Sequence, residues 1–144
     1  MKKILLIHGP NLNLLGERKP EVYGTKTLDE VNSDLNSFAL SAGVELLIFQ
    51  SNHEGKIIDY LHEHRNKVDA VVINPGAYTH YSYAIRDAIE AIKIPTVEVH
   101  LSDISKREGF RRTSVTCDVC VGQFSGKGIE SYFEGIDHLM KLNS

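Results

Sequence analysis

The sequence predicts an α/β protein: a doubly wound, five-stranded parallel sheet with helices on both faces. Short β-branched apolar runs alternate with segments of helical period along the 144 residues. The chain contains no internal repeat, low-complexity stretch or linker, so residues 1–144 are expected to form one domain. Its composition, 42% hydrophobic and 24% charged, is that of a globular protein whose length suffices for a full core.

Five apolar runs predict the strands. The expected strands span residues 2–8, 44–50, 69–74, 96–100 and 115–121. Because the segments between them have helical period, each connection is expected to be a right-handed crossover between parallel strands. The pattern favours a flavodoxin-like strand order.

Capping patterns and apolar periodicity predict the helices. Thr27 and Glu30 have the spacing of a capping box ahead of the first helix, and Ser51 and Glu54 have the same spacing ahead of the second. The third helix is expected to begin near Ser82. A last helix is predicted from the apolar periodicity close to the C-terminus.

Charge and hydropathy exclude several classes of protein. The formal net charge is −3 without a block of like charges, which argues against a nucleic-acid binder. No stretch approaches the roughly 18 apolar residues of a membrane span, and the apolar run after Lys2 and Lys3 is too short for a secretory signal. Two cysteines cannot form a disulfide framework, so we expect a cytoplasmic protein with no membrane partner.

Polar residues follow the predicted strands. In a doubly wound sheet, ligands bind beyond the carboxyl ends of the strands. The residues at four of these ends are rich in His, Asn, Gln and Ser and poor in carboxylates. Such an edge suits a small polyhydroxylated or carboxylated molecule and is a poor site for a hard cation, so no metal is expected. The residues concerned include His8, Asn11, Gln50, Asn52, His53, Asn74, His80, His100 and Ser102.

A long connection follows the first strand. Residues 9–24 form a 16-residue segment where two to six residues are usual, which is typical of an active-site lid. It contains Arg18 and Tyr23. A tyrosine acts as a base only as its phenolate, which a neighbouring guanidinium stabilises. The alternative is that Tyr23 anchors the loop by packing while Arg18 is solvated.

Glu98 and His100 share one face of the predicted fourth strand. A carboxylate beside an imidazole fixes its tautomer and favours the imidazolium, which makes a general acid near neutral pH. The alternative is a structural histidine that caps the following turn. His80 is compatible with a helix cap, a supporting contact or a surface position.

Three further patterns have weaker functional interpretations. Cys117 and Cys120 have CxxC spacing but fall in the predicted fifth strand, where residues three apart point to opposite faces. The glycine-rich run 122–128 lacks the spacing of a phosphate loop and is expected to be a turn that approaches the site. Arg111 is a candidate clamp for a carboxylate or hydroxyls, or part of a basic surface patch.

Together, the segments at the predicted sheet edge closely resemble the type II 3-dehydroquinate dehydratase family. The resemblance covers essentially the whole chain and implies a catalytic domain over residues 1–144. The segments that carry it are residues 9–16 (GPNLNLLG) with Arg18, Pro20, Tyr23 and Gly24, residues 50–55 (QSNHEG), residues 74–80 (NPGAYTH), residues 97–102 (VEVHLS), and Phe110 with Arg111.

The resemblance implies a cofactor-free dehydration of 3-dehydroquinate to 3-dehydroshikimate in the shikimate pathway. Tyr23 is then the base, with its phenolate favoured by Arg18. The enolate is stabilised through a bound water near Asn11, and His100, oriented by Glu98, protonates the departing hydroxyl. An enolate requires hydrogen-bond donors and a poor leaving group requires an acid, so these residue types suit the reaction.

The resemblance also implies binding residues and an assembly. Asp87 is expected to reach the site of a neighbouring subunit in a homododecamer, a tetramer of trimers. Lys19 and Asp103 depart from the family pattern, the first at a position in the lid that is usually acidic, the second at one that is usually asparagine. The residues that match substrate-binding positions are Asn74, His80, Leu101, Ser102 and Arg111.

The alternatives are a non-enzymatic flavodoxin-like module and a different mechanism of dehydration. A phosphoreceiver requires acidic residues after the first strand, and an FMN-binding module requires a Ser/Thr-rich phosphate loop there; this chain has Gly9 and Pro10. Dehydration through a lysine Schiff base would use Lys19, the lysine of the lid.

Overall fold

The computed structural model describes residues 2–142, which form a three-layer α/β fold. The central sheet has five parallel strands in the order β2-β1-β3-β4-β5. The predicted doubly wound, flavodoxin-like architecture is confirmed. The strands are β1 (Lys2–His8), β2 (Val44–Gln50), β3 (Ala70–Asn74), β4 (Thr96–His100) and β5 (Gly122–Ser125).

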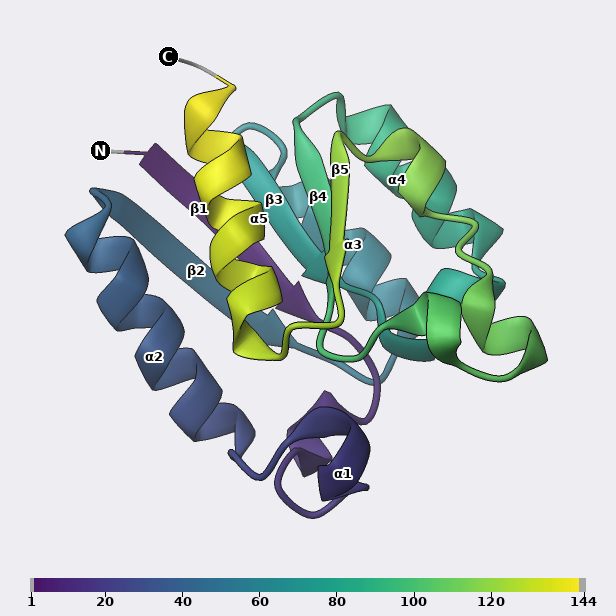
Figure 1. Ribbon diagram of the computed structural model, residues 1–144. Helices are drawn as coiled ribbons and strands as arrows, with labels where there is room; N and C mark the ends of the chain where they lie inside the picture. Colours follow the sequence, from purple (N-terminus) through teal and green to yellow (C-terminus); the bar gives the residue numbers. More distant parts are fainter. Residues whose placement is uncertain (1, 143–144) are drawn as a thin grey trace.

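Helices cover both faces of the sheet, with α2 and α5 on one side and α3 and α4 on the other (Figure 1). Five short 3-10 helices lie in the connections. The α-helices are α1 (Pro20–Tyr23), α2 (Leu28–Ser41), α3 (Glu54–His64), α4 (Tyr83–Ile92) and α5 (Ile129–Lys141), and the 3-10 helices are η1 (Leu12–Leu14), η2 (Gly76–His80), η3 (Ile104–Lys106), η4 (Gly109–Arg112) and η5 (Cys117–Val119).

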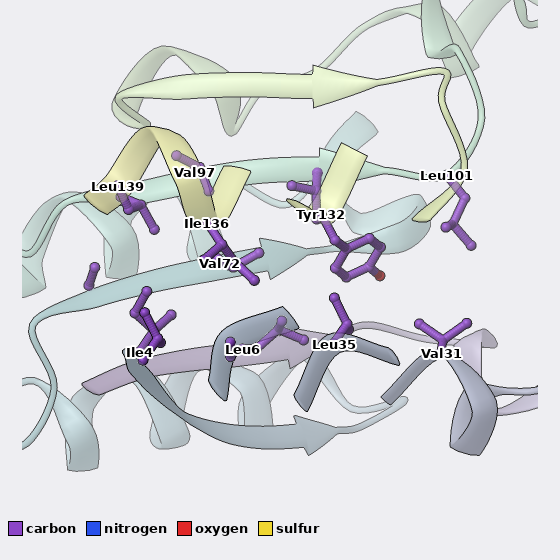
Figure 2. Close-up of a cluster of buried hydrophobic side chains, with 14 of the residues drawn as sticks. Ile4, Leu6, Val31, Leu35, Val72, Val97, Leu101, Tyr132, Ile136 and Leu139 are labelled. Carbon is purple, nitrogen blue, oxygen red and sulfur yellow. The ribbon is translucent and has the colours of Figure 1, made fainter. Parts of the chain in front are cut away.

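Alternation along the strands divides the core into two clusters. Ile4 and Leu6 of β1 pack towards α2 and α5, in the cluster that Figure 2 shows, whereas Leu5 and Ile7 pack towards α3 and α4. All four side chains are fully buried. Because helices cover both faces, the strand is a continuous apolar run without polar alternation.

The carboxyl ends of β1 and β3 approach each other closely. Gly9, which follows β1, donates its N–H to the carbonyl of Asn74 at 2.7 Å. A Cβ atom at Gly9 would lie 2.6 Å from the carbonyl carbon of Pro75, so no side chain fits there. This contact brings the long connection of residues 9–24 against the end of β3.

The capping box predicted for α2 and the start predicted for α4 are confirmed, and the capping box predicted for α3 is wrong. Thr27 and Glu30 form a reciprocal capping box, and Ser82 caps α4. Residue 53 is the N-cap of α3 and provides no side-chain cap. The Ser51 hydroxyl accepts from the N–H of residue 53, and Glu54 accepts a hydrogen bond from the Ser82 hydroxyl instead of closing a box.

The fifth strand predicted over residues 115–121 is wrong. It forms instead over Gly122–Ser125, after the 3-10 helix η5. The β-branched residues before η5 imitate a strand, but the Thr116 hydroxyl bonds Glu98 and draws this segment across the carboxyl end of the sheet. Gly122 begins this strand, and a Cβ there would lie 3.0 Å from the Phe124 ring.

The prediction that Cys117 and Cys120 lie on opposite faces of a strand is therefore wrong. Cys117 opens η5 and Cys120 directly follows it, so the two do not lie on opposite faces of a strand. Both are free thiols. Burial raises the pKa of each thiol, which disfavours the reactive thiolate.

Candidate active site

A pocket opens beyond the carboxyl ends of β1, β3 and β4, where the fold class predicts a ligand. Its empty volume of about 490 Å³ includes space that is open to solvent. The lining residues are Pro10, Asn11, Leu12, Arg18, Tyr23, Asn74, Gly76, Ala77, His80, His100, Leu101, Ser102, Ile104, Arg107 and Arg111.

Tyr23 enters the pocket from the C-terminal end of α1, between two arginines. The Arg18 guanidinium carbon lies 4.5 Å from the centroid of the Tyr23 ring, over its face. The Arg107 guanidinium donates to the Tyr23 hydroxyl oxygen at 3.3 Å and to Ser102 Oγ at 3.2 Å. The phenol of Tyr23 therefore contacts two cationic side chains.

His100 and Glu98 lie on the same face of β4 as the alternation predicts. His100 Nε2 lies 2.8 Å from Glu98 Oε2, and both residues are buried. Since the carboxylate accepts, Nε2 carries the proton, which leaves Nδ1 as the ring nitrogen that can exchange a proton with a ligand.

Several donors keep Glu98 ionised. Its burial raises the pKa, but hydrogen bonds from His100, Thr116 and Gln123 outweigh this effect, and the pKa falls to about 2. Gln123 Nε2 donates to the carboxylate at 2.7 Å. Hydroxyls of Thr79, Ser114 and Thr116 also donate to it. The ring of His100 therefore lies against a charged carboxylate that holds its Nε2–H.

The chain matches one family over nearly its full length. The family model described as dehydroquinase class II matches residues 2–140. The 3-dehydroquinate dehydratase of Caldicellulosiruptor bescii is 56% identical over 143 residues, covering 99% of each chain. That of Bacillus pumilus is 54% identical over 140 residues, covering 97% of this chain and 95% of that protein.

A solved structure agrees. The crystal structure of the type II dehydroquinase from Butyrivibrio crossotus superposes with a TM-score of 0.95 at 48% identity, covering 96% of this chain and 97% of that one. The chain belongs to the class II dehydroquinase family. It is therefore an enzyme of that class and has the fold of a dehydroquinase.

His80 and Arg111 form a polar and basic part of the pocket wall. The His80 Nδ1–H donates to the carbonyl of Thr113 at 2.7 Å. Burial lowers the pKa of His80, which favours the neutral ring with Nε2 as an acceptor. Arg111, on η4, donates to Glu108 at 2.8 Å and retains further N–H groups that could bind a carboxylate.

Backbone geometry shapes the wall between residues 9 and 12. Asn11 adopts a left-handed conformation, with φ of 70°. Its N–H donates to Asn52 Oδ1 at 2.9 Å, and Gln50 Nε2 donates to the carbonyl of Gly9 at 3.1 Å. The polar residues predicted at the end of β2 therefore support the pocket wall from behind.

Most of the predicted site residues come together at this pocket, and one does not. Glu98 lies behind His100, and the others line the cavity. Asp87 lies on the exposed face of α4 and does not line the pocket of its own chain. Of the two departures, Lys19 is the exposed, left-handed N-cap of α1. Asp103 caps η3 by accepting from the Ser105 N–H at 3.0 Å.

Sequence reasoning missed Arg107 and the donors around Glu98. Arg107 ends the irregular segment at η3, where no periodicity indicates its direction. The sequence offered one indication that Arg107 belongs to the site, which is that this basic residue follows the fourth strand. Thr116 was assigned to the wrong element and Ser114 to none, so their position beside Glu98 could not be predicted.

Within residues 2–142, no cluster of three or more His, Cys, Asp or Glu could hold a metal ion. No helix in that range is long and apolar enough to cross a membrane.

Proposed function

We propose that this dehydroquinase dehydrates 3-dehydroquinate to 3-dehydroshikimate by anti elimination through an enolate. Tyr23 is the base and His100 is the acid. One observation carries the proposal: the Tyr23 phenol and the His100 imidazole line the same pocket, and each has its own charged partner. Paired groups with opposite proton-transfer roles are what an elimination requires.

In the first step, the Tyr23 phenolate takes a proton from the carbon beside the substrate ketone. The C–H electron pair moves towards the ketone oxygen, and an enolate forms. Arg107 and Arg18, which contact the phenol oxygen and the ring face, stabilise the phenolate that starts the step. A water held near Asn11, Pro10 and Ala77, all of which line the pocket, donates to the enolate oxygen.

In the second step, the enolate collapses and the tertiary C–O bond breaks. Hydroxide is a poor leaving group, so the departing oxygen must be protonated. The His100 imidazolium donates from Nδ1, while Nε2–H stays bonded to Glu98. Water leaves with the conjugated enone as product. Tyr23 then returns its proton to solvent and His100 takes one up, which restores both groups.

The remaining wall residues bind the substrate. Arg111 is assigned to the carboxylate, since its guanidinium can bind one with two hydrogen bonds. The other residues assigned to hydroxyls or to shaping the pocket are Asn74, His80, Leu101 and Ser102.

Paired tyrosine variants test the assignment of the base. Tyr23→Phe is expected to lower kcat by about 10²–10⁴-fold, because it removes the proton acceptor and leaves the ring in place. Tyr81→Phe is the matched control, since Tyr81 is 59% exposed and does not line the pocket. Near-normal turnover by a folded Tyr23→Phe protein would refute this role.

A Schiff-base mechanism has no support in the site. Lys19 is exposed, and no lysine is among the described residues that line the pocket. Borohydride added with substrate is expected to leave the protein unmodified by mass spectrometry. Substrate-dependent modification of Lys19 would replace the enolate proposal.

The assembly is part of the proposal. We propose that residues 1–144 act as a single catalytic domain in the cytoplasm, within the shikimate pathway, and that twelve chains form a tetramer of trimers. The exposure of Asp87 on α4 is consistent with a contribution to a neighbouring site. Light scattering is expected to give the mass of twelve chains, and a monomer with full activity would remove Asp87 from the site.

A further inference from the structure

A line of four polar side chains runs from the pocket wall into the protein, and three of them, His8, Tyr132 and Asn32, have no role in the proposed reaction. His8, at the end of β1, and Tyr132, on α5, have no exposed surface, and Asn74, at the end of β3, is 3% exposed. Asn32 of α2 completes the line. Figure 2 shows Tyr132 on the α2 and α5 side of the sheet, near the carboxyl ends of the strands.

Hydrogen bonds join these four side chains into one line. Asn74 Nδ2 donates to the Tyr132 hydroxyl oxygen at 2.9 Å. The Tyr132 hydroxyl lies 3.0 Å from His8 Nδ1, and His8 Nε2 lies 2.8 Å from Asn32 Oδ1. The line therefore connects α2, β1, α5 and β3 and ends on a residue of the pocket wall.

In each hydrogen bond along this line, one side chain can be assigned as the donor and the other as the acceptor. Because the Tyr132 oxygen accepts from Asn74, its own proton is available to His8 Nδ1. His8 Nδ1 is then an acceptor, and Nε2 carries the proton that is donated to Asn32. Burial lowers the pKa of His8 to about 4, which agrees with the neutral ring that this arrangement requires.

The backbone of Gly76 fixes these donor and acceptor roles. Its N–H, which can only donate, lies 3.1 Å from Asn74 Oδ1. A flipped Asn74 amide would turn its NH₂ group against this N–H, donor against donor. A side chain at position 76 would be strained, because the φ of Gly76 is 59° and a Cβ there would lie 3.1 Å from the carbonyl oxygen of Pro10.

We propose that Tyr132 and His8 are positioning residues that hold the Asn74 amide so that it offers an N–H donor to the ligand. Gly76 occupies Oδ1 and Tyr132 occupies one of the two Nδ2 protons, so the second N–H remains available. The pocket would then select an oxygen acceptor at this position, such as a hydroxyl or carboxylate oxygen. The inference rests on the proposed function in that Asn74 binds the substrate.

The test removes one hydroxyl. Tyr132→Phe keeps the buried ring and deletes the acceptor for Asn74, so KM for 3-dehydroquinate is expected to rise about ten-fold, with kcat within about two-fold of wild type. Thr96→Val is the matched control: it deletes another fully buried hydroxyl, which bonds the carbonyl of Ile94 at the opposite end of the sheet. This control is expected to leave KM unchanged.

A double-mutant cycle separates positioning from general destabilisation. In an Asn74→Ala background, Tyr132→Phe is expected to change KM by less than about two-fold, because the group it positions is gone. If Tyr132→Phe leaves KM unchanged in the active wild-type background, or if the two effects multiply, the inference is wrong.

Failure of the proposed function is distinguishable from failure of this inference. Folded wild-type protein without turnover refutes the function alone. In that case a crystal structure of Tyr132→Phe decides the inference: Asn74 is expected to leave its bond with the Gly76 N–H, and an unchanged amide would overturn it.

Discussion

The guanidinium of Arg107 donates to the phenol oxygen of Tyr23 at 3.3 Å, across 84 positions of sequence. Arg18 takes a different position, over the face of the same ring. The Arg107 guanidinium carbon also lies over this ring, 5.6 Å from its centroid, but Arg107 alone of the two is hydrogen-bonded to the atom that exchanges the proton in the proposed reaction. Its contribution to the charge on that atom should exceed that of Arg18, because Coulomb energy falls with distance.

Arg107→Ala is therefore expected to lower kcat/KM by about 10²-fold or more, since it removes the cation at the phenolate oxygen. Steady-state kinetics with 3-dehydroquinate measure the effect. Arg112→Ala is the matched control because Arg112 is exposed and does not line the pocket. Equal activity of the two variants would show that Arg107 plays no part in the chemistry.

Thr116→Val tests the donors around Glu98. The change keeps the shape of the side chain and deletes a hydroxyl that bonds the Glu98 carboxylate. The free energy of unfolding is expected to fall by about 1–3 kcal/mol, the cost of removing a hydrogen bond to a buried charge. Urea denaturation measures it, with Thr96→Val as the comparison on β4. A smaller loss in Thr116→Val than in the control would contradict this role.

Stability is expected to fall in mild acid because of His8. Burial lowers its pKa from 6.5 to about 4, against a smaller opposing effect from Asn32. Between these two values the unfolded chain binds a proton at His8 that the folded protein does not, so the free energy of unfolding decreases as the pH falls. The full loss from this residue is about 3 kcal/mol.

Urea denaturation at about pH 7 and about pH 4.5 checks this dependence. Glu98 contributes in a lower window, because its depressed pKa makes it stabilising above its unfolded value of 4.5, and this contribution is lost towards about pH 2. His8→Gln should flatten the upper window. A wild-type stability that is unchanged across that window would exclude a neutral, buried His8.

Lys93 ends α4 with a φ of 56°, a conformation that glycine adopts without strain. Lys93→Gly is expected to raise the free energy of unfolding by about 0.5–1 kcal/mol. Glu90→Gly, three residues earlier and inside the helix, should lower it by about 1 kcal/mol. Thermal denaturation of both variants shows whether each substitution raises or lowers stability. Destabilisation by Lys93→Gly would contradict the strain assigned to the backbone at Lys93.

Periodicity in the sequence was sufficient for most of the fold. The first, second and fourth strands have the predicted bounds, although β2 is only partly buried and β4 includes the polar Glu98 and His100. The strand predicted over residues 115–121 was wrong because hydroxyls that bond Glu98 control that segment, and such a tertiary contact has no local sequence pattern.

Some residues of the site could likewise be predicted from the sequence, and others could not. A parallel sheet aligns the carboxyl ends of its strands. The places of Asn74 and His100 at the ends of predicted strands were therefore sufficient to predict that both lie at the pocket. Arg107 could not be placed, since irregular backbone around η3 sets its direction. The line from Asn32 to Asn74 joins four elements, so it follows from packing and could not be predicted from sequence spacing.

The most direct test of the central proposal adds 3-dehydroquinate to purified wild-type protein, without added metal or cofactor, and follows the absorbance of the conjugated enone. We expect an immediate rise that Tyr23→Phe reduces by about 10²-fold or more. No rise from folded wild-type protein would contradict the proposed dehydration, and a full rise from Tyr23→Phe would contradict the proposed base.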